Sequence, residues 1–169
     1  DTQPKKEATP EFHSEHLKTK FKDPTLKKIN DYYNVFDQKK FNIKKSVESV
    51  SSNSETPLTD TNDEFLTELK EYAKSLGVGS IGYARLSRDL IFQEMGVLYD
   101  NVIVLALEMD WDKMEKAPSP ETLGMVMETY DGLGIISNKI TDFLRKAGYA
   151  AQAGHPLGGL VLYPPLGHQ

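Results

Sequence analysis

A histidine close to the end of the sequence has the residue type and the setting that proton transfer requires. His155 lies in the stretch GYAAQAGHPLGGLVLYPPLGHQ, residues 148–169, which is apolar and rich in glycine and proline. An imidazole titrates near neutral pH, and the neighbouring glycines leave backbone amides accessible to a polar ligand. His155 is therefore the candidate proton donor. The alternative is a structural histidine whose ring hydrogen-bonds a backbone carbonyl.

Two other groups of polar side chains are candidate sites. His13 and His16 are three residues apart and share one helical face, but no third metal ligand accompanies them. We interpret them as a solvated pair and predict no metal site. Asp110 and Asp112 flank Trp111. They either cap a turn or form one wall of a ligand site.

Several common sites are excluded by motif and composition. The glycines of GVGSIGYAR, residues 77–85, precede and interrupt a predicted strand, whereas a dinucleotide fingerprint follows a strand and opens a helix. No phosphate-binding P-loop and no serine nucleophile elbow occurs. The sequence has no cysteine, which excludes disulfides, a thiol nucleophile and a cysteine-held iron–sulfur cluster within this chain.

The distribution of charge argues against nucleic acid as a partner. Of the 20 basic residues, 11 lie in the first 50 positions, together with 8 of the 25 acidic residues. The rest of the chain is thus strongly acidic, whereas binding to phosphates requires clustered basic charge. No apolar run approaches the roughly 20 residues that a membrane helix needs, and no signal peptide opens the chain. We expect a cytoplasmic protein without a membrane span.

Residues 1–60 are expected to form a polar N-terminal arm and linker with one short helix. Apolar residues from Leu26 to Phe36 recur at helical spacing, and residues 44–62 are rich in serine and threonine. Either the arm is solvated with its helix docked on the body, or it docks a partner.

The body, residues 61–169, alternates between helical and strand patterns. A helix capped by Asp60 or Thr61 is predicted to end at Gly77, and strands are predicted over 80–86, with Gly82 inside, and over 101–109. The second strand is a continuous aliphatic run, typical of burial on both faces. A short helix is expected between the two strands.

A long helix is predicted over 119–148, and a third strand over 149–153. Gly124, Gly132 and Gly134 each cost roughly 1 kcal/mol inside a helix. Either the helix breaks near YDGLG, or the glycines allow a ligand or the sheet to approach closely. The order of elements predicts an α/β fold with a small mixed or mainly parallel sheet flanked by helices, in which ligands bind beyond the strand ends.

Four segments resemble, in order, the corrinoid-binding half of the epoxyqueuosine reductase and reductive dehalogenase family: LTELKEYAKSLGVGSIGYARL, NVIVLALEMDW, KITDFLRKAGYAAQAGHP and YPPLGHQ. The resemblance implies a nitroreductase-like, corrinoid-binding domain over 61–169 that stops before an AGLGW motif and a cysteine-rich domain. It also implies cobalamin as cofactor, 4Fe-4S clusters only in the missing downstream region, electron supply through that region and an unknown small-molecule substrate.

The resemblance also suggests site residues. Epoxyqueuosine reductases carry a proton-donating aspartate directly after the third strand, where this chain has Gly154 followed by His155. Either His155 has taken over that role or the substrate differs. The expected corrinoid contacts are Gly82, Tyr83, Gly154, His155, Pro156, Gly158, Gly159 and Tyr163.

Two other functions remain open. HPLGG, residues 155–159, resembles the HP…GG of cobalamin-processing chaperones, which suggests a corrinoid-binding or trafficking module without redox turnover. In the third alternative the glycine-rich loop only turns the chain of a scaffold protein.

Overall fold

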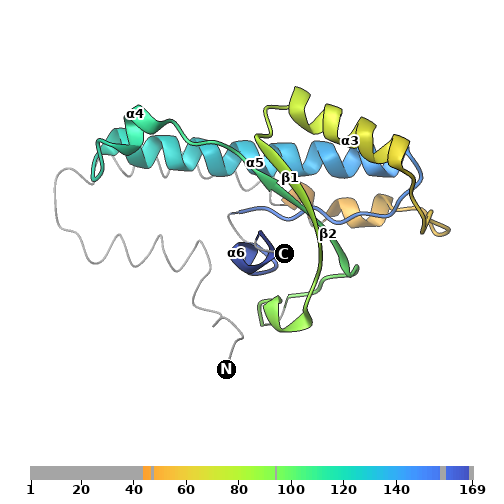
Figure 1. Cartoon of the computed structure of the whole chain (residues 1–169). Helices are drawn as coiled ribbons and strands as arrows, with labels where there is room; N and C mark the ends of the chain where they lie inside the picture. The colour runs from red at the N-terminus through yellow and green to blue at the C-terminus, as the bar shows by residue number, and fades with distance from the viewer. Residues whose placement is uncertain (1–43, 47, 94, 157–158, 168–169) are drawn as a thin grey trace.

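The computed structural model describes residues 44–46, 48–93, 95–156 and 159–167 (Figure 1). The helix expected over 26–36, the pair His13 and His16, and the candidate contact Gly158 lie outside these residues. The described elements are, in chain order, η2 (Ser49–Ser52), α3 (Asp63–Ser75), β1 (Ser80–Arg85), η3 (Arg88–Leu90), β2 (Asn101–Ala106), α4 (Trp111–Met114), α5 (Pro120–Lys146) and α6 (Tyr163–Leu166).

Helix α3 begins one or two residues later than the predicted caps, Thr61 and Asp60, would place it. The cap is Asn62, whose side-chain oxygen accepts a hydrogen bond of 2.8 Å from the backbone N–H of Phe65. The predicted stop is confirmed, because Gly77 has a φ of 89°, a left-handed conformation that glycine adopts without a steric penalty. The helix buries Leu69 and Ala73, one turn apart on its inner face.

Helix α5 is continuous over 27 residues. Ser119 caps it by accepting a 3.1 Å hydrogen bond from the N–H of Thr122, and Gly148, with a φ of 95°, follows its end. The alternative in which the helix breaks near YDGLG is therefore wrong. Gly134 is buried in the middle of the helix, and what lies against it is the side chain of His155, which belongs neither to a ligand nor to the sheet that the second alternative named.

The described sheet has two strands, and they are antiparallel. β1 pairs with β2 so that Gly82 lies opposite Val104 and Tyr83 opposite Ile103. The predicted combination of helices with a small sheet is confirmed, but this sheet has no parallel pair. Where a short helix was expected, the described residues between β1 and β2 form the single 3₁₀ turn η3, and antiparallel strands need no crossover helix.

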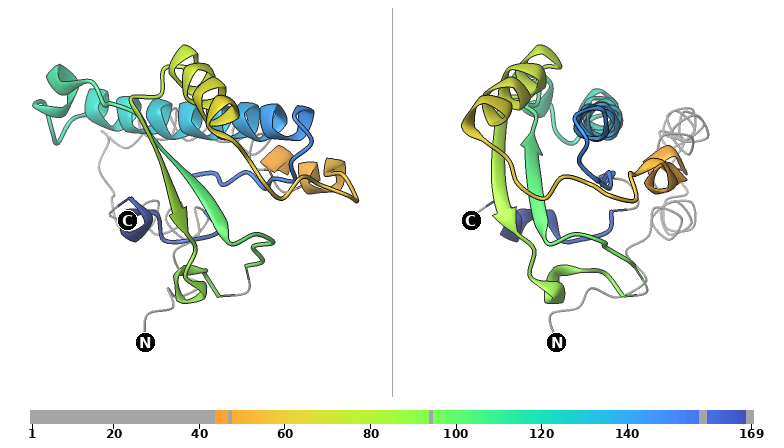
Figure 2. Two further views of the ribbon diagram at one scale, coloured as in Figure 1. Left: turned by 45° about the vertical axis from the view of Figure 1, so that its right-hand side comes forward. Right: turned by 90° about the vertical axis from the view of Figure 1, so that its right-hand side faces the viewer.

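The two faces of the sheet pack against different parts of the chain. Because side chains alternate along a strand, Ile81 and its partner Leu105 share one face, and both pack on the cluster that α3 and α5 form. Ala84 and Val104 belong to the other face and pack on the cluster of Leu86, Val161 and Leu166. Figure 2 shows α3 and α5 together, with α6 well separated from them along the strands.

The described part of the expected linker is folded onto the body. Residues 49–52 form the 3₁₀ turn η2, and side chains of this region bond to α5, beside which it lies in Figure 1. Further along, Leu58 makes an isolated parallel bridge with Tyr149. The serine-rich composition predicted an extended or mobile linker, but the side chains of Ser46, Ser49 and Asn53 hydrogen-bond to side chains of α5.

Candidate functional site

His155 is buried at the end of an extended segment. Its side chain is 2% exposed, and Ala151 and Ala153, two and four residues earlier, are buried too. This alternation is that of a strand, as the sequence predicted for 149–153. Apart from the bridge at Tyr149, however, the described residues give this segment no strand neighbour.

The imidazole of His155 lies against Gly134 of α5. A Cβ added to Gly134 would lie 2.8 Å from Cε1 of His155 and closer still to Nε2 and Cδ2. Any side chain at position 134 would therefore displace the ring. The glycine that costs helix stability is required because a histidine from a distant segment packs directly on the helix backbone.

Side chains, rather than a neighbouring strand, bind the backbone of the extended segment. The N–H of Ala151 donates to the side-chain oxygen of Asn53 at 3.0 Å, and the Ala151 carbonyl accepts from Arg145 at 2.9 Å. One residue further, the Gln152 amide bridges the loop before β2, since its oxygen accepts from the N–H of Leu98 and its nitrogen donates to the Gly96 carbonyl, both at 3.0 Å.

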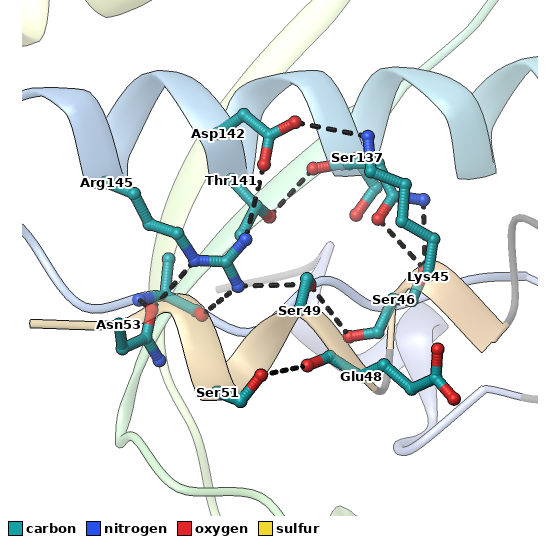
Figure 3. Close-up of polar contacts among 12 residues, drawn as sticks. Lys45, Ser46, Glu48, Ser49, Ser51, Asn53, Ser137, Thr141, Asp142 and Arg145 are labelled. Carbon is teal, nitrogen blue, oxygen red and sulfur yellow. Dashed lines mark hydrogen bonds and ion pairs between the residues drawn. The ribbon is translucent and has the colours of Figure 1, made fainter.

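Arg145 is the centre of the polar network in Figure 3. Its Nε donates to Asn53 at 2.8 Å, and its two terminal nitrogens reach Ser49 at 3.1 Å and Asp142 at 3.3 Å. The arginine side chain is only 9% exposed. A guanidinium has five N–H donors in a fixed plane, which lets one buried residue join three segments of the chain.

A second polar contact lies further toward the start of α5. The side chains of Ser46 and Asn138 are hydrogen-bonded, and the Asn138 amide also donates to the Gly134 carbonyl at 3.1 Å. Gly134 is the residue that the His155 ring covers. The region around residue 46 therefore reaches the same turn of α5 as His155 does.

Tyr163 packs against the glycines of its own segment. Its hydroxyl donates to the His155 carbonyl at 3.1 Å, and a Cβ on Gly154 or Gly159 would meet the same hydroxyl at 3.3 and 2.7 Å. Burial raises the pKa of Tyr163 to about 12, although a hydrogen bond with the backbone of Leu160 opposes the shift. Tyr163 thus occupies the glycine surfaces that the sequence assigned to a ligand.

Gly82 and Tyr83 lie apart from this cluster. They are neighbours on β1, so their positions belong to opposite faces of the sheet. Tyr83 is 42% exposed, with the Lys70 ammonium 5.9 Å from its ring centroid, and partial burial raises the pKa of its hydroxyl. Apart from its two chain neighbours, no described residue lies within 4 Å of a Cβ built on Gly82.

The structure thus gathers Gly154, His155, Gly159 and Tyr163, and leaves Gly82 and Tyr83 on the strand. Pro156 is half-buried next to His155. Asp110 caps α4 by accepting a 3.2 Å hydrogen bond from the N–H of Lys113, which confirms the capped turn. Its neighbour Trp111 is 72% exposed.

Sequence reasoning missed Asn53 and Arg145. Arg145 lies in the last turn of α5, where a basic side chain is usual for its effect on the helix dipole, so nothing marked it as a buried residue. Asn53 belongs to the polar stretch whose composition predicts a linker. The one available signal was Gly134, whose cost in a helix required an explanation.

Comparisons with known proteins assign no family. No protein-family model matches the chain, and a search of curated proteins gave no significant match. Among the described residues there is no group of three or more histidine, aspartate or glutamate side chains that could hold a metal ion. No helix in this part of the chain combines the length and the apolar character needed to cross a membrane.

Proposed function

We propose that the chain is the corrinoid-binding domain of a cobalamin-dependent and iron–sulfur-dependent reductase, of nitroreductase-like architecture and similar in type to epoxyqueuosine reductases and reductive dehalogenases. The proposal rests on the ordered resemblance of four segments and on one observation. A glycine-containing segment, residues 159–162, and the single turn α6 that follows it cover one apolar face of the β1–β2 pair. A corrin ring is flat and largely apolar, with amide side chains that backbone groups can bind.

The fit of the residues to a corrinoid requires a displacement. The Tyr163 hydroxyl fills the space next to Gly154 and Gly159, so those backbones become accessible only when the ring moves. Among the described residues, two backbone hydrogen bonds join the glycine-containing segment to the turn after β1. The N–H of Phe92 donates to the Leu160 carbonyl at 3.0 Å, and the N–H of Leu162 donates to the Leu90 carbonyl at 2.9 Å. In the proposal this segment lifts from the sheet, and the glycine backbones then contact the corrinoid.

In the proposal the cofactor supplies a strongly reducing, nucleophilic metal, and the chain supplies position and a proton. His155 is the proton donor of the reaction. Its ring is 2% exposed with the segment closed, so the same displacement has to uncover it before it can reach a substrate. Tyr163 leaves the His155 carbonyl in that step, because its hydrogen bond holds the closed arrangement.

A titration tests the proposal. The 169-residue chain is mixed with cob(II)alamin, and binding is followed by absorption and electron paramagnetic resonance, which report loss of the lower ligand. We expect saturable formation of the form without that ligand, together with a change in the ultraviolet absorbance of Tyr163 that the Tyr163→Phe variant lacks. If neither this chain nor a longer protein containing it gives the spectral change, the proposal is wrong.

The burial of His155 favours a second candidate, a corrinoid-binding or trafficking module without redox turnover. A ring with 2% exposure suits a structural role in a protein that only holds the cofactor. Corrinoid transfer from the loaded chain to an acceptor apoenzyme would support this candidate. Electron transfer to the bound corrinoid through an adjoining cluster domain would support the reductase.

A further inference from the structure

A short polar segment is fastened to the side of α5. We call this segment, residues 44–46 and 48–53, the clasp. At its start Ser46 bonds to Asn138, and at its end Ser49 and Asn53 bond to Arg145. Figure 3 shows the clasp running beside the last turns of α5, with these side chains directed toward the helix.

The clasp also binds the segment that carries His155. Asn53 accepts from the N–H of Ala151, and the Arg145 that Asn53 orients donates to the carbonyl of the same residue. Both backbone groups of Ala151 thus depend on one side-chain pair. Because residues 151, 153 and 155 share one buried face, the position of Ala151 along α5 sets the position of the His155 ring over Gly134.

The geometry points to a conformational role. We propose that the clasp holds residues 151–155 against α5, and that Asn53 and Arg145 are positioning residues that keep His155 buried until the clasp is released. The significance of His155 as a proton donor rests on the proposed function. The statement that the clasp controls the exposure of His155 is independent of the proposed function.

Release is expected to be local. The main core consists of Leu69, Ala73, Val78, Ile136 and Ile140, and no clasp residue belongs to it. The outer contacts of the clasp are weak as well, since the ion pair between Lys45 and Asp142 joins side chains that are each 43% exposed. Loss of the Asn53 contacts therefore frees the extended segment without removing apolar side chains from the core.

The experiment compares three substitutions in the 169-residue chain. Asn53→Leu removes the acceptor that Arg145 and Ala151 share. Asn53→Asp keeps that acceptor, and the hydroxyl of Tyr99, which now accepts from Asn53 at 2.8 Å, can turn to donate. Ser51→Ala is the matched control, because the Ser51 hydroxyl is exposed and bonds only within the clasp, to the Glu48 carbonyl.

Two measurements follow each variant. Modification of His155 by diethylpyrocarbonate is quantified by mass spectrometry on the peptide that contains it, with the denatured chain as the fully reactive reference. Hydrogen exchange is measured for Ala151 and for Leu69. Asn53→Leu should raise both the His155 modification rate and Ala151 exchange by roughly tenfold or more, the factor that corresponds to losing one to two net hydrogen bonds. Leu69 exchange should stay unchanged.

Asn53→Asp and Ser51→Ala should both retain wild-type rates. Unchanged His155 modification in a folded Asn53→Leu variant would overturn the proposal. So would equal acceleration at Ala151 and Leu69, because the clasp would then support the whole fold rather than the position of one segment. All measurements are made without corrinoid, so a failed corrinoid titration removes the proposed function and leaves this inference standing, and the reverse also holds.

Discussion

The imidazole of His155 occupies the space that a side chain on Gly134 would need. The contact joins residue 134, in the middle of α5, to a segment that follows the end of that helix. It gives the first prediction. Gly134→Ala should destabilise the protein by about 1–3 kcal/mol, the usual cost of forcing extra atoms into a packed site, despite the higher helix propensity of alanine.

Gly132→Ala is the matched control for that measurement. A Cβ there would meet only Cδ1 of Leu107, at an ordinary contact distance of 3.9 Å. This variant should gain up to about 1 kcal/mol from helix propensity. Urea denaturation of both variants checks the pair, and a Gly134→Ala protein as stable as Gly132→Ala would show that the His155 ring does not pack there in solution.

The second prediction concerns Tyr163 and pH. Its pKa is about 12 in the folded chain and 10.0 as the ordinary value, so the unfolded chain loses this proton first as the pH rises. The stabilisation is complete below pH 10 and declines from there through pH 12. Between pH 9 and 11 the wild-type chain should lose about 1 kcal/mol more than Tyr163→Phe. Urea denaturation at the two pH values measures the difference, and equal losses would contradict the buried position of Tyr163.

The third prediction tests how closely Tyr163 packs on the glycines. A Cβ on Gly159 would lie 2.7 Å from the Tyr163 hydroxyl, so Gly159→Ala should push the ring toward solvent and lower its pKa toward 10. Ultraviolet titration of tyrosine ionisation follows the change. Gly82→Ala, with open space around its Cβ, should leave the titration of Tyr163 as it is in the wild type. A high Tyr163 pKa retained in Gly159→Ala would refute the packing.

The fourth prediction follows from composition. The chain has no cysteine, and thiolates are what hold 4Fe-4S clusters. Reconstitution with iron and sulfide should leave no cluster absorbance, while a ferredoxin treated in parallel regains its own. Stoichiometric cluster bound to this chain would contradict the proposal that a separate region holds the clusters.

Local patterns in the sequence predicted the two long helices, α3 and α5, because caps and stops are local. Ser119 and Pro120 marked the start of α5, and Gly77 the end of α3. The third strand predicted over 149–153 is an extended segment in which Ala151 and Ala153 are buried, but only Tyr149 makes a bridge. Alternation reports that one face is buried, but it does not say what lies beside the backbone.

The remaining features depend on residues far apart in the chain. No spacing rule connects Asn53 to Ala151, and the predicted third strand has side chains beside it where a neighbouring strand was expected. For the same reason the sequence predicted glycine backbones accessible to a ligand, and Tyr163 covers two of them. His155 can be buried against α5 because residue 134 has no side chain. The sequence shows a glycine at a helical position, but it does not show that the His155 ring packs there.

The clasp and its partners are far apart in the sequence, and this separation determines when their hydrogen bonds can form during synthesis. Ser46 and Asn53 are separated from their partners on α5 by 92 residues, and Asn53 from Ala151 by 98. At about 5–20 residues per second, the clasp leaves the ribosome about 5–20 s before those partners exist. Throughout that interval its amide and hydroxyl groups are hydrated. The clasp can hold residues 151–155 only after Arg145 and Ala151 have been synthesised, and a ribosome stalled before residue 145 holds a chain in which that arrangement cannot form.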